Sequence, residues 1–330
     1  MEEGAQVLEE RPLPPEIEVV EWAGGKQAAK LKDGYHLLDD LRRVIQHIKP
    51  DLIHAGPVQR SAFLAALSGF HPLVSMSWGY DLLIDANRNP FWRRATRYTL
   101  KHSDAFVGDC DTIRNLAILY GMAADRIVTF PWGIDLHHFN VRTCKPANLA
   151  TFSLLSTRNF EPIYGIDVIA RAFVLAARQR PELRLTLLGG GSQWAPIRQL
   201  LLVGGVFDRV QFPGLVSFAD LPAFHQNADI YVCASHSDGT SISLLEAMAC
   251  GTPVIVSDIP GNREWVAAGE NGWLFHDGDA KDMADAILHA MDQRQDLPVL
   301  GQKARQVAES RADWGKNFPQ LEQAYRLALG

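Results

Sequence analysis

Residues 237–257 constrain the fold of this chain more than any other stretch. The apolar, β-prone residues 229–233 before them predict a buried strand. Apolar residues at helical spacing within 244–248 predict a helix, which the Gly-Thr-Pro at 251–253 would end. A second buried strand is predicted at 254–257, directly after that stop. The stretch therefore indicates a strand–loop–helix–strand unit of an α/β fold.

The loop of this unit brings polar groups to the start of the helix. It enters the helix through Gly239, Thr240, Ser241 and Ile242. The first N–H groups of a helix have no intrahelical acceptor, so the last three of these residues predict a phosphate-binding site. The carboxylate of Asp238 beside this site is better suited to bind a hydroxylated group attached to the phosphate than the phosphate itself. Glu246 lies in the second turn, and its side chain leans back toward the same end. Two carboxylates beside a phosphate-binding site together favour a sugar nucleotide as the ligand.

Asp238 and Glu246 are separated by seven residues, and the sequence that starts at Glu246 is Glu-Ala-Met-Ala-Cys-Gly-Thr-Pro-Val-Ile. Both features resemble the donor-site signature of the retaining GT-B glycosyltransferases of family 4, also called glycosyl transferases group 1. The resemblance extends from about Asp51 to the C-terminus. It implies an α/β fold with two Rossmann-like domains facing each other across a cleft. The chain departs from the family at Asp238, where Glu is usual, and the shorter side chain is expected to change the choice of sugar or slow transfer.

The resemblance also divides the chain. It implies an acceptor-side domain at 1–140, completed by a C-terminal helix at 317–330 that crosses back to it, a linker at 141–149, and a nucleotide-sugar-binding domain at 150–316. Family members usually begin with a strand and a Gly-rich loop that residues 1–32 do not show, although residues 16–22 alternate like a single strand. The first domain is therefore expected to be truncated, or to work without that segment.

Residues 78–81 follow a predicted strand at its C-terminal end, where open α/β sheets place ligands. Their sequence, Trp-Gly-Tyr-Asp, resembles the His-Gly-x-Asp motif of the family, with Trp78 in place of His. The resemblance implies that Asp81 contacts a hydroxyl near the reaction centre as a catalytic residue. An equally weighted alternative is a helix cap or a hydrogen bond within the loop.

On the donor side, Arg158 follows the predicted strand 151–156. It resembles the Arg with which the family grips the donor diphosphate. Tyr164 stands near the place of the Lys that accompanies this Arg, and it brings no charge. The alternative for Arg158 is a structural arginine on the surface.

A run of three glycines starts at Gly189 and begins like a dinucleotide fingerprint, but Trp194 stands where the third Gly of that fingerprint belongs. A nicotinamide-dependent oxidoreductase is therefore disfavoured. By resemblance, the backbone at Gly190 approaches the nucleotide, and groups around Phe212 flank its base.

Composition and charge limit the classes of function and the cellular location that the chain is expected to have. The net charge of −6 gives no indication of nucleic-acid binding. Four scattered cysteines favour reduced thiols in a cytoplasmic protein: Cys110, Cys144, Cys233 and Cys250. No run has the length of a transmembrane span, and the acidic N-terminus is unlike a signal peptide. Residues 90–102 predict a basic helix with an aromatic start, for which residues 91–102 suggest peripheral contact with the inner membrane face. The alternative is a solvated helix face.

The resemblance implies a retaining hexosyltransferase of the kind used in polysaccharide biosynthesis. It would move a sugar from a nucleoside-diphosphate sugar to a hydroxyl of a glycan, a lipid-linked acceptor or a small molecule. In this scheme Glu246 holds the ribose, Asp238 holds the sugar and stabilises the oxocarbenium-like state, and no cofactor or metal is needed. Asp109-Cys110-Asp111 has the letters of a metal motif but lies in the other half of the chain. The alternative function is a non-catalytic or fragmentary GT-B protein that binds nucleotide without transfer.

Overall fold

The computed structural model describes residues 14–20, 22, 33–141 and 150–330. The described residues up to Pro131 form one compact unit with Phe318–Gly330, and Trp132–Asn317 form a second. The division falls before the expected boundary at 140, because Ile134 N donates to Ala312 O at 2.8 Å and Phe139 is buried in the second core. The expected linker 141–149 lies, beyond residue 141, outside the described residues. Residues 14–20 form no strand.

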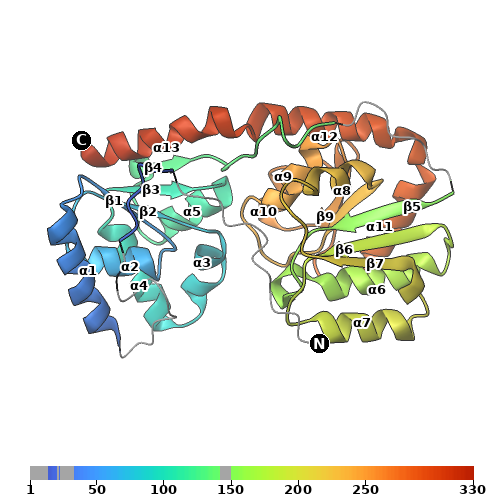
Figure 1. Cartoon of the computed structure of the whole chain (residues 1–330), viewed down its shortest axis with the longest axis horizontal. Helices are drawn as coiled ribbons and strands as arrows, with labels where there is room; N and C mark the ends of the chain where they lie inside the picture. Colours follow the sequence, from blue (N-terminus) through green and yellow to red (C-terminus); the bar gives the residue numbers. More distant parts are fainter. Residues whose placement is uncertain (1–13, 21, 23–32, 142–149) are drawn as a thin grey trace. The chain divides into compact units, whose positions relative to one another are not determined.

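The first unit contains a parallel sheet with the order β1-β2-β3-β4 (Figure 1). Its strands are β1 (Ile53–Ala55), β2 (Leu73–Met76), β3 (Ala105–Gly108) and β4 (Ile127–Thr129). The helices of this part of the chain are α1 (Gly34–Ile48), α2 (Ser61–Ser68), α3 (Tyr80–Leu83), α4 (Pro90–Lys101) and α5 (Asp111–Leu119). The start of α4 is well specified, since Asn89 Oδ1 accepts from Trp92 N at 3.0 Å and Pro90 occupies the first turn.

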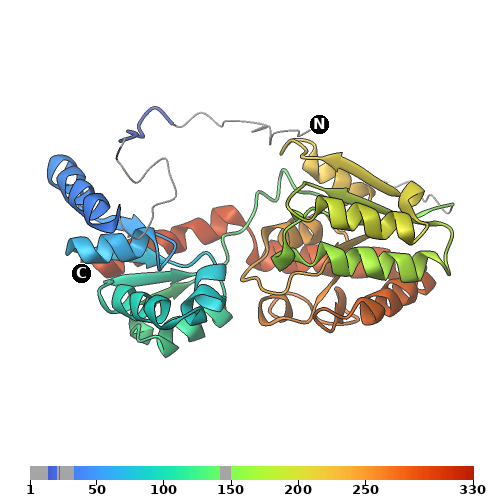
Figure 2. The ribbon, with the colours of Figure 1, turned by 90° about the horizontal axis from the view of Figure 1, so that it is seen from below.

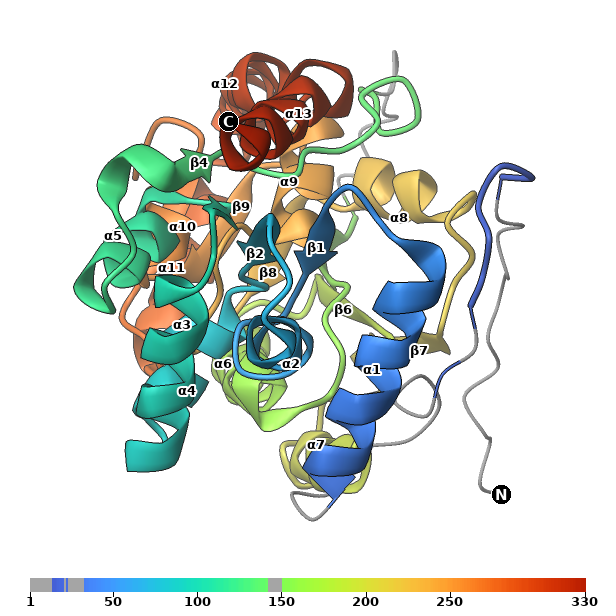
Figure 3. The same cartoon turned by 90° about the vertical axis from the view of Figure 1, so that its left-hand side faces the viewer.

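The last helix, α13 (Trp314–Leu329), returns to the first unit. The hydroxyl of Tyr325 lies 2.9 Å from His54 Nδ1, and Arg126 Nη1 donates to Leu327 O at 3.0 Å. Figure 3 shows α13 on the opposite side of the sheet from α2 and α4. The expectation that the C-terminal helix crosses back to the N-terminal domain is therefore confirmed.

The second unit contains a parallel sheet with the order β10-β9-β8-β5-β6-β7. Its strands are β5 (Phe152–Ser156), β6 (Leu183–Leu188), β7 (Val210–Gly214), β8 (Ile230–Cys233), β9 (Val254–Ser257) and β10 (Gly272–Phe275). Its helices are α6 (Ile166–Ala177), α7 (Trp194–Val203), α8 (Leu221–Asn227), α9 (Ile242–Ala249), α10 (Pro260–Arg263), α11 (Ala280–Asp292) and α12 (Leu297–Arg311). Figure 2 shows α6 and α7 side by side along the sheet.

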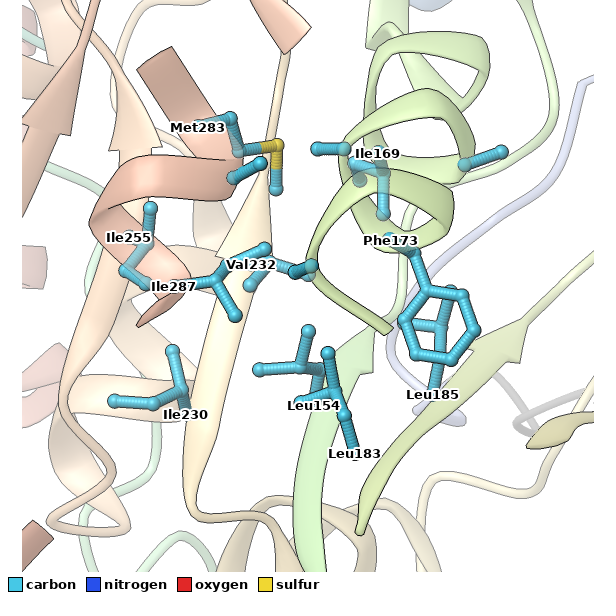
Figure 4. Packing of buried hydrophobic residues seen from close by; sticks show 14 of the residues in the cluster. Leu154, Ile169, Phe173, Leu183, Leu185, Ile230, Val232, Ile255, Met283 and Ile287 are labelled. Carbon is cyan, nitrogen blue, oxygen red and sulfur yellow. The ribbon is translucent and has the colours of Figure 1, made fainter. Parts of the chain in front are cut away.

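Helices cover both faces of this sheet, which explains why its strands are almost continuously apolar. On one face, Ile169 and Phe173 of α6 pack with Leu154 and Leu185 of the strands (Figure 4). On the other face, α9 and α12 pack over a second cluster that includes Tyr231 and Met248. The core therefore fixes the strand ends from which the loops described next emerge.

Candidate functional site

The order of the six strands reverses at β5, which lies between β8 and β6. In open α/β sheets the crevice at the carboxyl ends of strands beside such a reversal is the usual ligand site. Arg158 follows β5 and Asp238 follows β8, so both side chains start from this edge.

Arg158 and Asp238 form an ion pair in which Nη2 lies 2.8 Å from Oδ2. Their side chains are only 14% and 20% exposed, so the pair is largely buried. Burial raises the pKa of Asp238, while the Arg158 charge opposes that rise. The ring of Tyr164 stacks under the guanidinium, with 4.0 Å between Cζ and the ring centroid. Tyr164 thus supports one face of the Arg158 guanidinium.

The second guanidinium nitrogen of Arg158 reaches the start of α9. Its Nη1 lies 3.2 Å from Ser241 Oγ and 3.4 Å from Ser243 Oγ. Ser241 is the N-cap residue, but its side chain makes no capping hydrogen bond to the helix. Thr240 and Ser241 are buried, whereas Ile242 is 39% exposed. Arg158, Asp238 and the α9 N-terminus therefore form one cluster.

Gly261, at the start of α10, lies against the backbone of the loop that precedes α9. A Cβ at this position would lie 2.3 Å from Gly239 O and 2.5 Å from Asp238 O. No side chain fits that space, so the close approach of two backbone segments requires glycine here.

Glu246 lies in the second turn of α9, as expected, with a side chain that is only 10% exposed. Its Oε2 is 3.6 Å from Nε2 of His225 on α8. Burial, together with the Glu246 charge, raises the pKa of Cys250 to about 12. The importance of His225 was not predicted from the sequence, because no local pattern links it to Glu246.

Gly190 and Phe212 occupy the neighbouring strand ends. The carbonyl of Gly190 accepts from Phe160 N at 2.9 Å, and a Cβ at Gly190 would meet nothing within 4 Å. Phe212 packs edge-on against Trp194, with 4.7 Å between ring centroids, and Trp194 stacks on Phe160. The sequence did not predict this aromatic cluster, because its members come from three separate segments.

Asp81 belongs to the first unit and is almost fully buried. Its carboxylate accepts from Val58 N at 2.9 Å, from Ser77 Oγ at 2.6 Å and from Trp78 N at 3.0 Å. Burial raises its pKa against the effect of these hydrogen bonds. Such contacts agree with the loop-fixing alternative, whereas Trp78 beside it is 64% exposed.

The described residues contain no group of three or more His, Cys, Asp or Glu side chains that could hold a metal ion. None of their helices has both the length and the apolar character needed to cross a membrane.

Comparison with known families identifies both halves of the chain. Residues 145–307 match the family model described as glycosyl transferases group 1, and residues 5–109 match the one described as glycosyl transferase 4-like.

Two curated relatives are D-inositol 3-phosphate glycosyltransferases. The protein of Pseudarthrobacter chlorophenolicus is 25% identical over 88% of this chain and 74% of its own length. That of Paenarthrobacter aurescens is 28% identical over 64% of this chain and 54% of its own length. The aligned region thus spans about three quarters of the length of the first relative and about half of the length of the second.

Among solved structures, Anabaena HepE in complex with UDP matches with a TM-score of 0.77 at 19% identity, covering 88% of this chain and 82% of that one. Its complex with UDP-glucose gives a TM-score of 0.76. At this level of identity the likeness shows the fold, which is GT-B.

Proposed function

This chain belongs to the GT-B glycosyltransferases of group 1, the family-4 type, and from that premise we propose that it transfers a sugar from a nucleoside-diphosphate sugar to a hydroxyl acceptor. The transfer retains anomeric configuration and needs no metal. The observation that carries the proposal is the Arg158–Asp238 pair at the N-terminus of α9, with 2.8 Å between Nη2 and Oδ2. It combines a cation for phosphate, a carboxylate for sugar hydroxyls and the positive end of a helix.

In this proposal the donor diphosphate lies against Arg158 and the N–H groups at Thr240, Ser241 and Ile242. Those groups stabilise the charge that develops on the departing diphosphate, which is the task a metal performs elsewhere. Glu246 accepts from the ribose hydroxyls. The backbone at Gly190 approaches the nucleotide, and the backbone around Phe212 flanks its base. The UDP and UDP-glucose held by Anabaena HepE make uridine nucleotides the first probes.

The diphosphate competes with Asp238 for the same guanidinium. Its arrival therefore releases the Asp238 carboxylate, which can then accept from the sugar hydroxyls and stabilise the oxocarbenium-like transition state. The one-methylene difference from Glu places this carboxylate closer to its own loop, which restricts the sugars that it can reach. In the other unit, Asp81 fixes the loop that carries the exposed Trp78 and Tyr80, and these two side chains offer a surface for a glycan or lipid-linked acceptor.

A peripheral membrane contact at the cytoplasmic face completes the proposal. Four cations of α4 are exposed on a helix that carries no acidic residue: Arg93, Arg94, Arg97 and Lys101. Phe91 beside them is 50% exposed. Basic and aromatic side chains together favour the interface of anionic lipid. The wild-type protein should sediment with phosphatidylglycerol vesicles, and a variant with Arg94→Glu and Arg97→Glu should not. Equal sedimentation of the variant and the wild type would contradict the membrane contact.

The test of the main proposal is thermal unfolding against UDP, GDP, ADP and their sugar conjugates. A ligand that binds only the folded state raises the midpoint. Transfer with the stabilising donor, in the presence of EDTA, then tests metal independence, and NMR of the product shows whether configuration is retained. No midpoint shift with any nucleotide would contradict the donor site.

Nucleotide binding without transfer is the second candidate function. The observation that favours it is Asp81, whose two carboxylate oxygens already accept hydrogen bonds within their own unit. It predicts a midpoint shift with nucleotide but neither transfer to acceptors nor slow hydrolysis of the donor sugar.

A further inference from the structure

We propose that His225 is the positioning residue for Glu246. Its Nε2–H would donate to Glu246 Oε2 and leave Oε1 to accept from the vicinal hydroxyls of the ligand. The inference rests on the proposed function in one respect, namely that Glu246 receives the ribose of a nucleotide.

Glu246 is a largely buried carboxylate. Its side chain is only 10% exposed, and a buried carboxylate without compensation is costly. Among the ion pairs of the described residues, His225 is the partner of Glu246, with 3.6 Å between Nε2 and Oε2. A shift of a few tenths of an ångström would convert this contact into a hydrogen bond.

His225 is a fully buried histidine, and neither of its ring nitrogens has a hydrogen-bond partner among the described residues. A ring that served only to fill space between Tyr231 and Phe139 would be better apolar, because buried polar groups without partners are destabilising. A donor directed at Glu246 is a reason for histidine at this position.

The neighbouring polar groups leave this task to His225. The hydroxyl of Tyr231 donates to Ser243 Oγ at 2.8 Å. The guanidinium of Arg305 donates to Phe139 O and Ala249 O, both at 2.7 Å, and pairs with Glu309. The thiol of Cys250 is only a weak hydrogen-bond donor.

The test compares UDP dissociation constants, measured by calorimetry, for the full chain and three His225 variants. His225→Phe keeps an aromatic ring at this position but removes the ring nitrogens. The dissociation constant of this variant for UDP should rise about 10-fold, because it loses one hydrogen bond to a charged group. His225→Gln can place an amide nitrogen near the Nε2 position and should remain within about 3-fold of the wild type. His225→Asn places its nitrogen near the Nδ1 position and should therefore weaken UDP binding as much as His225→Phe does. It provides the same test if the Phe variant does not fold.

Two further variants separate positioning from structural damage. In the Glu246→Gln background, His225→Phe should add less than about 2-fold to the loss, because coupled residues are not additive. The matched control is His289→Phe, an exposed histidine on α11 of the same unit, which should leave the dissociation constant unchanged.

Unchanged UDP binding in the folded Phe and Asn variants, or effects of His225 and Glu246 that add fully, would overturn the role of His225 alone. Failure of the wild type to bind any nucleotide would overturn this inference and the proposed function together.

Discussion

The guanidinium of Arg158 and the carboxylate of Asp238 join the loops that follow β5 and β8, with 2.8 Å between Nη2 and Oδ2. The two residues are far apart in the chain, and the strands that precede them are neighbours in the sheet. In the proposed function the same guanidinium binds the donor diphosphate, so this pair opposes ligand binding and must open for it.

This relationship predicts that Asp238→Asn separates binding from transfer. The substitution removes the carboxylate that competes for Arg158, so UDP should bind about 3- to 10-fold more tightly, as expected for the loss of one nearby like charge. Transfer should fall at least about 100-fold, because the amide cannot stabilise the oxocarbenium-like state. Calorimetry with UDP and a transfer assay measure the two effects. Asp208→Asn makes the same charge change at an exposed position and should alter neither; weaker UDP binding by Asp238→Asn would contradict the competition.

The close approach at Gly261 predicts a contrast with Gly190. Gly261→Ala would place a Cβ 2.3 Å from Gly239 O, so the loop that holds Asp238 must move. We expect a loss of about 1–3 kcal/mol in unfolding free energy, together with lower affinity for nucleotide. At Gly190 nothing lies within 4 Å of the added carbon, so Gly190→Ala should keep the unfolding midpoint and lower affinity only. Thermal unfolding with and without UDP compares both variants, and a fully stable Gly261→Ala would contradict the predicted clash.

Cys250 should be unreactive in the folded protein. Burial, with the neighbouring Glu246 charge, raises the pKa of its thiol to about 12, and the thiolate is the reactive form. Cys110 and Cys233 are also buried. Iodoacetamide at pH 8 should therefore label peptides with these three residues at least about 100-fold more slowly in the folded protein than in urea, because the pKa of a free thiol is about 8.5. Rapid labelling of Cys250 without urea, quantified by mass spectrometry, would show that the helix end at α9 is open in solution.

The buried Asp81 predicts a pH dependence of stability. Burial raises the pKa of Asp81 above its value in the unfolded chain, so the folded protein keeps a proton over a pH range in which the unfolded chain has released it. The stability gained is therefore complete below the unfolded pKa, about 3.9, and is lost as pH rises through the folded value. The unfolding free energy of wild type minus that of Asp81→Asn should fall as pH rises above about 4. Urea unfolding between pH 4 and 7 measures this difference, and Asp125→Asn, at an exposed carboxylate, should show no such trend.

Local sequence patterns were sufficient for most of the elements. The predicted strand at 254–257 coincides with β9, and the helix predicted between Gly239 and Gly251 is α9, because strand and helix periods are encoded over a few residues. Helix α7 was missed: Pro196 in its first turn and the apolar run Leu200–Val203 conceal the helical period. Pro is compatible with a first turn, so propensity and structure do not conflict there.

The family-4 GT-B fold was also predicted from sequence, through the spacing of Asp238 and Glu246 and the text around them. That spacing is local, since both residues belong to one loop and one helix. The pairing of Arg158 with Asp238, the burial of Glu246 against His225 and the contact of Gly261 with Gly239 were decided only by the tertiary structure. Each depends on which strands are neighbours and which helices pack together, and these contacts between distant segments leave no period or spacing in the sequence.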